Sequence, residues 1–153
     1  MHNVNMKAEQ LHQLIWMSRP LMQAAESCVE NGLTGTNLTV RMRAVLEILH
    51  KYGEQTVPEL AARLEIQRQY VQIMCNETLA SGFTEQRPNP RHKRSPILTL
   101  TNQGNALIED ILSKEMQIMQ EMSEDLSTED IATALKVILS VVDGLKKRTG
   151  ERK

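Results

Sequence analysis

Residues 56–101 read TVPELAARLEIQRQYVQIMCNETLASGFTEQRPNPRHKRSPILTLT, and this stretch decides the fold. It opens on Thr56, followed three residues later by Glu59, the pattern of a capping box at a helix N-terminus. Pro58 then falls in the first turn, where its missing N–H is not needed. The stretch therefore predicts a short helix that begins at Thr56 and breaks near Glu65.

A second helix is predicted over about residues 67–81, after which the period of the apolar residues changes from that of a helix to that of a strand. Its core-facing stripe is Val71, Met74, Cys75, Thr78 and Leu79. Residues 83–87 and 95–101 follow as two short strands. The seven residues between them, 88–94, form a basic tip stiffened by proline. The order is helix, break, helix and β-hairpin.

Working outward, the flanking segments have helical periodicity. The expected helices are residues 6–30 with a kink or split at Pro20, residues 39–52 capped by Thr39, residues 101–123 capped by Thr101, and a last helix starting at Ser127. Asn31-Gly32 and residues 35–37 are expected to break the chain between the first two. The last helix has a heptad-like apolar seam, formed by Ile131, Leu135, Ile138, Val142 and Leu145.

These elements predict a mainly α fold with a small β-hairpin wing, that is, a winged helix-turn-helix with long dimerisation helices. We expect residues 1–38 to form an N-terminal dimerisation arm and residues 39–101 to form the winged helix-turn-helix. Residues 102–153 are expected to be C-terminal dimerisation helices. The apolar seam has no other sizeable surface to cover in one chain, so we expect a homodimer.

Charge is segregated along the chain, although the formal net charge is only −1. Residues 41–100 carry nine Lys or Arg against six Asp or Glu, whereas residues 102–130 carry one Lys against eight acids. Positive charge is thus concentrated around the helix-turn-helix and wing. This distribution is expected of a nucleic-acid reader with separate dimerisation helices, and the partner that it predicts is double-stranded DNA.

Other classes of protein find little support in the sequence. No stretch has the length of a membrane span or the layout of a secretory signal. Cys28 and Cys75 form neither a metal-ligand spacing nor a disulfide framework. No activated nucleophile, carboxylate pair or phosphate-cradling glycine loop is visible. We therefore expect a reduced, cytoplasmic protein that is not an enzyme, has no catalytic residue, and binds no metal, cofactor or membrane.

The second helix of the pair has a polar face opposite its core stripe. At 100° per residue, four side chains fall on it: Gln69, Gln72, Ile73 and Asn76. Gln and Asn can pair bidentately with adenine, and Ile can contact a thymine methyl in the major groove. We interpret this face as base-reading. Arg68, at the helix N-terminus, is expected to contact the DNA backbone.

The cations of the hairpin tip predict a contact with the neighbouring minor groove, whose negative potential attracts Arg. The predicted minor-groove residues are Arg91, Lys93 and Arg94. Arg41 is a further expected contact to the DNA backbone. The roles of Arg41 and Arg43 stay open, because one of the two could instead form an intersubunit ion pair.

Three segments together resemble the MarR (multiple antibiotic resistance regulator) family of winged-helix transcription regulators. They are residues 38–46, LTVRMRAVL; residues 58–64, PELAARL; and residues 82–104, which end in LTLTNQG. The resemblance implies a homodimer with interleaved terminal helices and a pseudo-palindromic operator. It also implies that Arg94 is the minor-groove contact. Two features depart from the family pattern: His92-Lys93 stands where an Asp commonly orients the wing arginine, and Gln67 and Ile73 replace a Ser and an Arg of the recognition helix.

We therefore expect a sequence-specific transcription regulator, a repressor that is relieved by a small-molecule effector or another signal. One alternative is a winged helix used to contact another protein. A second is a redox sensor acting through Cys28, although the neighbouring carboxylates of Glu26 and Glu30 oppose the reactivity of a thiol. The operator, the effector and the regulated genes are not encoded in any recognisable pattern.

Overall fold

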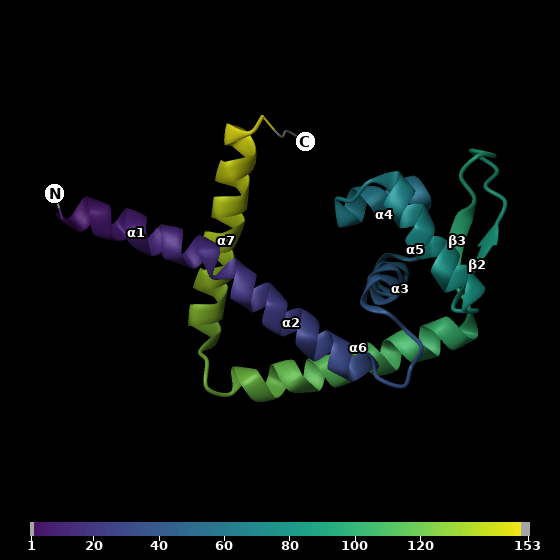
Figure 1. The fold of residues 1–153 in the computed structure, drawn as a ribbon, viewed down its shortest axis with the longest axis horizontal. Helices are drawn as coiled ribbons and strands as arrows, with labels where there is room; N and C mark the ends of the chain where they lie inside the picture. The colour runs from purple at the N-terminus through teal and green to yellow at the C-terminus, as the bar shows by residue number, and fades with distance from the viewer. Residues whose placement is uncertain (1, 151–153) are drawn as a thin grey trace. The chain divides into compact units, whose positions relative to one another are not determined.

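The structure is a computed structural model that describes residues 2–150. Along the chain the elements are α1 (His2–Trp16), α2 (Ser18–Leu33), α3 (Val40–Tyr52), β1 (Gln55–Thr56), α4 (Val57–Leu64), α5 (Arg68–Ala80), β2 (Thr84–Arg87), β3 (Ile97–Leu100), α6 (Asn102–Ser123) and α7 (Thr128–Arg148) (Figure 1). The chain divides into two compact units, Met1–Glu115 and Met116–Lys153. The predicted mainly α fold with a small β wing is confirmed.

The first predicted helix is split, and the break lies three residues before the proline. α1 ends at Trp16 and α2 starts at Ser18. Pro20 therefore falls in the first turn of α2, where the missing N–H costs no helical hydrogen bond. The expected break at Asn31-Gly32 is wrong: α2 continues to Leu33, and the chain turns only at Gly35, whose φ is 81°.

Side-chain caps start several of these helices, and the sequence predicted them correctly. Thr39 accepts a hydrogen bond from the backbone of Met42, and Ser127 accepts one from that of Asp130. At α4 both halves of the capping box form, since Thr56 accepts from the Glu59 N–H and the Glu59 carboxylate accepts from the Thr56 N–H. Caps of this kind each stabilise a helix by about 1 kcal/mol.

The sheet has a third strand that the sequence analysis missed. β3 lies in the centre, between β1 and β2, and both neighbours are antiparallel to it. β1 is only two residues long, which is too short for the alternation of apolar and polar residues that predicts a strand. Its register pairs Gln55 with Leu98, so the base of the wing is joined to the segment that leads directly into α4.

α3 is the central element of the core, because its two faces enter two different apolar clusters. One cluster holds the helix-turn-helix and consists of Val45, Ile48, Leu49, Leu60, Ala61, Val71, Met74, Cys75 and Leu98. The other consists of Leu33, Leu38, Met42, Leu46, Phe83, Ile108 and Ile111. α3 therefore fixes α4 and α5 on one side and α2 and α6 on the other.

The run Leu-Thr-x-x-Gly at residues 100–104 closes the wing against α6. The Thr101 hydroxyl donates to the carbonyl of Gly82 at 2.7 Å and accepts from the Gly104 N–H at 3.0 Å, which caps α6. Gly104 has no room for a side chain, because a Cβ there would lie 1.9 Å from the carbonyl oxygen of Phe83. The motif thus combines a helix cap at Thr101 with a close approach between the backbones of Gly104 and Phe83.

Large apolar side chains remain exposed on the terminal helices. Every seam residue of α7 is open to solvent in the single chain, from Val142 at 43% to Leu135 at 57% exposed. In α1 and α2 the exposed residues include Leu11, Trp16, Leu21 and Met22. Among the described residues no helix is both long enough and apolar enough to cross a membrane.

Candidate nucleic-acid interface

α5 presents the polar face that its sequence predicted. Val71, Met74, Cys75 and Thr78 are buried, while Gln69, Gln72, Ile73 and Asn76 are all exposed. Ile73 is the informative member, because its β-branched apolar side chain is 52% exposed and belongs to neither core cluster. The helix therefore offers solvent three carboxamides that can hydrogen-bond and an apolar branch beside them.

The start of α5 is held by the turn before it rather than by a side-chain cap. Gln67 occupies the N-cap position and makes no side-chain hydrogen bond there, as expected from the loss of a Ser. Glu65 adopts a left-handed conformation with φ 55°, and the N–H of Ile66 bonds to the carbonyl of Ala61. This sharp turn fixes the angle between α4 and α5 while leaving the first turn of α5 exposed.

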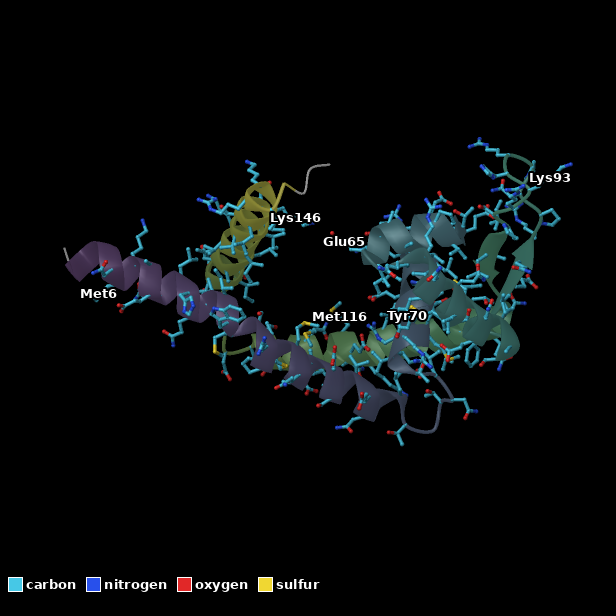
Figure 2. The ribbon with its side chains drawn as sticks, turned by 45° about the horizontal axis from the view of Figure 1, so that its top comes forward. Met6, Glu65, Tyr70, Lys93, Met116 and Lys146 are labelled. Carbon is cyan, nitrogen blue, oxygen red and sulfur yellow. The ribbon has the colours of Figure 1, made fainter. Side chains whose placement is uncertain are left out.

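The wing is a β-hairpin whose basic tip extends away from the helices. β2 pairs with β3 from Thr84–Leu100 to Arg87–Ile97, and residues 88–96 form the loop. Arg91, Lys93 and Arg94 are all exposed in this loop. Lys93 lies at its far end in Figure 2, beyond the last pair of the sheet.

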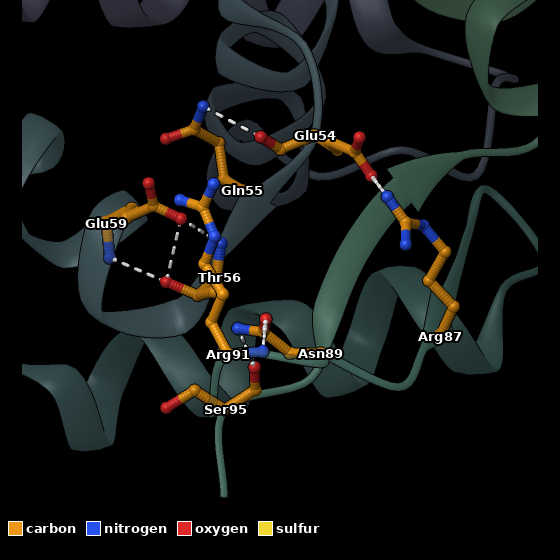
Figure 3. A network of polar contacts seen from close by, with 8 residues as sticks. All are labelled: Glu54, Gln55, Thr56, Glu59, Arg87, Asn89, Arg91 and Ser95. Carbon is orange, nitrogen blue, oxygen red and sulfur yellow. Dashed lines mark hydrogen bonds and ion pairs between the residues drawn. The ribbon is translucent and has the colours of Figure 1, made fainter. Parts of the chain in front are cut away.

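A cleft of about 730 Å³ lies between the wing and the start of α4. Its lining brings together cations from three elements: Arg68 of α5, Arg87 of β2 and Arg91 of the wing loop. Two carboxylates also line it, and both are already engaged, since Glu54 pairs with Arg87 and Glu59 belongs to the capping box (Figure 3). The cleft is therefore bordered by cations on the sides of both α5 and the wing.

Arg41 does not lie in this cleft. Its guanidinium makes two parallel hydrogen bonds to the carboxylate of Glu77 on α5, at 2.8 and 2.7 Å. The bond to Glu77, followed by one to Tyr70, raises the pKa of Arg41 above its usual value. The predicted backbone contact is thus engaged within its own chain, as a clamp between α3 and α5.

Arg43 is the other arginine whose role the sequence left open. Its guanidinium pairs with Glu115 of α6 and, at 3.1 Å, with Glu47 of α3. The hydrogen bond to Glu115 is the main cause that raises the Arg43 pKa. All these partners belong to the same chain, so the ion pair joins α3 to α6 within one protomer.

The structure adds residues that the sequence analysis did not select. Arg87 joins the cleft, Glu77 holds Arg41, and Asn89 organises the wing loop. Two of these act on partners more than 30 residues away, so no local pattern could reveal them. Asn89 had a visible signal, because it stands between Pro88 and Pro90 in a loop where backbone donors are scarce.

A second hollow, of about 770 Å³, lies where the end of α2, the start of α3 and the first half of α5 meet. Apolar side chains in its lining include Ile66 and Met74, and polar ones include Glu30, Arg41 and Tyr70. It therefore touches both the Arg41–Glu77 clamp and the helix that carries the exposed polar face.

The two cysteines differ in environment. Cys28 on α2 is exposed, whereas Cys75 is buried on the core side of α5. Burial raises the pKa of the Cys75 thiol to about 11. Within the described part of the chain, no three His, Cys, Asp or Glu side chains gather closely enough to hold a metal ion.

No family model matches the sequence. A solved structure, however, resembles the chain along almost all of its length. It is the crystal structure of a MarR family transcription regulator, with 33% identity and a TM-score of 0.87, covering 95% of this chain and 97% of that one. The chain belongs to the MarR family.

Two further MarR proteins support the assignment. The multiple antibiotic resistance protein MarR of Salmonella typhimurium is 28% identical over 124 residues, which cover 80% of this chain and 84% of that protein. A mutant MarR of E. coli complexed with operator DNA has 25% identity and a TM-score of 0.72, over 89% of this chain and 95% of that one.

The chain also matches uncharacterised proteins of Mycobacterium tuberculosis and Mycobacterium bovis. These are 35% identical over 69 residues, and the match spans about half of their length, 48%.

Proposed function

We propose that this MarR family protein is a sequence-specific transcription regulator that binds double-stranded DNA as a homodimer. The observation that carries the proposal is the exposed face of α5, formed by Gln69, Gln72, Ile73 and Asn76 beside a basic wing. The major groove is the one surface of DNA where such side chains can distinguish all four base pairs. A pseudo-palindromic operator follows from the two-fold symmetry of a dimer.

Each part of the interface has a distinct role in this proposal. α5 enters the major groove, and Arg91, Lys93 and Arg94 of the wing reach the adjacent minor groove. The DNA strand between the two grooves passes over the cleft that Arg68 and Arg91 border, so its phosphates meet Arg68 there. Arg41 contacts the backbone only when it leaves Glu77.

The dimer is formed by the terminal helices, with residues 1–38 and 102–153 as dimerisation segments around the winged helix of residues 39–101. The exposed seam of α7 supports this, since a monomer rarely leaves so many large apolar side chains in water. Sedimentation equilibrium on the purified protein tests it. A dimer is expected at micromolar concentration, and a folded monomer under the same conditions would contradict the proposal.

Repression relieved by a small-molecule effector is the mode of regulation that we propose. The hollow between α2, α3 and α5 supports it, because an occupant would touch Tyr70 and Met74 on the helix that reads DNA. An effector can shift binding only if it prefers one arrangement of α5 over another. Repression itself is tested in transcription assays on the selected operator, where added protein should lower transcript yield.

The experiment that tests DNA recognition is selection from a random DNA pool, followed by a salt titration of the selected site. If each protomer neutralises about four phosphates, the log–log slope of affinity against salt should be about −7 for the dimer. Arg68→Ala should weaken all sequences alike and make this slope shallower. A failure to enrich any sequence, combined with salt-insensitive binding to another protein, would instead favour a protein-interaction module.

A further inference from the structure

The wing loop is closed by the side chain of one residue, Asn89. Its Nδ2 donates to the carbonyl oxygen of Ser95 at 3.0 Å, and its Oδ1 accepts from the N–H of Arg91 at 3.1 Å. Asn89 is half-buried, whereas the cations beyond it are exposed. One carboxamide thus bridges the two sides of the loop and also fixes the backbone where the basic tip begins (Figure 3).

Backbone hydrogen bonds continue from this bridge through the tip. The N–H of His92 donates to the carbonyl of Asn89 at 3.2 Å, and the N–H of Ser95 donates to the carbonyl of His92 at 3.1 Å. Two turns therefore follow each other between Asn89 and Ser95. They enclose Arg91, Lys93 and Arg94, so the backbone that carries these cations is set by contacts at positions 89, 92 and 95.

The prolines of the loop leave few backbone groups that could make the hydrogen bonds of Asn89 in its place. Pro88, Pro90 and Pro96 have no N–H, so the loop lacks three backbone donors that could close it by the usual ladder. The residue before each proline is also kept out of the helical region. The carboxamide supplies one donor and one acceptor in their place. An ionised Asp could accept from Arg91 but could not donate to Ser95.

The base of the wing is anchored separately. Arg87, the last residue of β2, forms an ion pair with Glu54, which lies just before β1. Arg87 also faces Ile97 across the sheet. The hairpin is therefore fixed to the helix-turn-helix at its base and shaped by Asn89 at its tip. The base and the tip are held by different residues.

We infer that Asn89 is the positioning residue of the wing, which holds Arg91, Lys93 and Arg94 in the arrangement that enters the minor groove. The inference rests on the proposed function, because it requires that the wing contact DNA. Preorganisation of this kind raises affinity by lowering the entropy lost on binding.

The test begins without DNA, on the full-length protein. Asn89→Ala should lower the ¹⁵N heteronuclear NOE of the amides of residues 91–94. Asn89→Asp should lower it less, because the acceptor for the Arg91 N–H is kept. Gln86→Ala, at an exposed position of β2, is the matched control and should leave these NOE values unchanged. Equal melting temperatures for the four proteins would show that only the loop has changed.

DNA binding then separates positioning from simple loop rigidity. Arg94→Ala should weaken the wild-type protein about tenfold or more, the loss expected for one charge-assisted contact. In the Asn89→Ala background the same change should cost about twofold or less, because the contact is already impaired. Asn89→Asp is compared by its NOE values alone, because its added carboxylate also repels the DNA phosphates.

The outcomes distinguish this inference from the function on which it rests. Unchanged NOE values in Asn89→Ala, or an equal cost of Arg94→Ala in both backgrounds, would overturn the role of Asn89 while leaving DNA binding intact. If Arg94→Ala has no effect in the wild-type protein, the wing does not contact DNA. The proposed function of the wing then fails, and the role of Asn89 fails with it.

Discussion

The carboxamide of Gln72 donates from Nε2 to Oδ1 of Asn76 at 2.9 Å, one turn further along the exposed face of α5. The bond uses one donor of Gln72 and one acceptor lone pair of Asn76. It leaves free the acceptor of Gln72 and both donors of Asn76. The two side chains are therefore oriented by each other, so in the interface that we propose they would meet a base edge as a pair.

This bond predicts that Gln72 and Asn76 contribute to base recognition together. Gln72→Ala and Asn76→Ala should each cost about 1–3 kcal/mol at one or two adjacent base positions, most plainly at adenine. The double variant should cost clearly less than the two losses added together, by about 0.5 kcal/mol or more. Base-by-base binding profiles of the wild-type, single and double variants form the cycle that measures this coupling.

Ile73→Ala is the control within the same face, since Ile73 cannot hydrogen-bond to either carboxamide. The binding free energy lost in Ile73→Ala should add to the binding free energy lost in Asn76→Ala. Strict additivity of Gln72 and Asn76 would mean that the bond between them opens when DNA binds. An unchanged profile in both single variants would remove this face from base recognition and leave contact with another protein as the stronger alternative.

Much of the fold could be predicted because its signals are local. The capping box at Thr56, the caps at Thr39 and Ser127, and the exposed face of α5 each depend on residues within a turn or two. Periodicity therefore identified the helices and which side of α5 enters the core. The missing side-chain cap at Gln67 agrees with its residue type, since Gln is not among the preferred N-cap residues.

What the sequence missed depends on contacts between distant segments. β1 exists only because Gln55 and Thr56 meet β3, more than 40 residues away. The engagement of Arg41 by Glu77 spans 36 residues, and nothing near Arg41 predicts it. Charge counts treated Arg41 as a free cation, whereas the fold pairs it. Residue type predicts which groups can bind DNA, and tertiary packing decides which of them are available.

Gly104→Ala should destabilise the protein severely for one residue of its size. The new Cβ would lie 1.9 Å from the Phe83 carbonyl oxygen, a backbone atom that cannot rotate away. The start of α6 must then separate from the backbone of Phe83, at a cost of about 1–3 kcal/mol or more. Thermal or urea unfolding measures this. Gly32→Ala is the control, because nothing lies within 4 Å of a Cβ there, and its stability should be equal or slightly higher.

Thiol labelling should separate the two cysteines completely. Cys28 is exposed and should react readily with a maleimide or disulfide reagent, whereas Cys75 should react only when the protein opens. The pKa of Cys75, about 11 against an ordinary 9.0, also means that folding favours the neutral thiol. The stability that it contributes is complete below about pH 9 and falls as pH rises toward 11. Fast labelling of Cys75 in the native protein at pH 8 would contradict this.

Glu77→Gln tests whether Arg41 can reach DNA. In the wild-type protein Glu77 neutralises Arg41, and because both side chains are partly exposed, losing the ion pair should change the stability only slightly. The freed guanidinium can then bind a phosphate. We expect affinity to rise several-fold at low salt. The log–log salt slope should steepen by about 0.9 per protomer, or about 2 for the dimer. Arg41→Ala should lack this gain.

Removing any carboxylate near DNA reduces repulsion, so the comparison needs a matched variant. Glu85→Gln removes an exposed carboxylate on β2 and leaves Arg41 paired; its effect on the slope measures the general electrostatic contribution. Only a steeper salt slope in Glu77→Gln than in Glu85→Gln assigns the new phosphate contact to Arg41. This difference in slope should vanish when Arg41 is also replaced by Ala. If Glu77→Gln and Arg41→Ala instead both weaken DNA binding with an unchanged salt slope, the Arg41–Glu77 ion pair has a structural role and holds α5 on α3. Arg41 would then have no place among the backbone contacts, because a phosphate ligand cannot be removed without changing the number of counterions released.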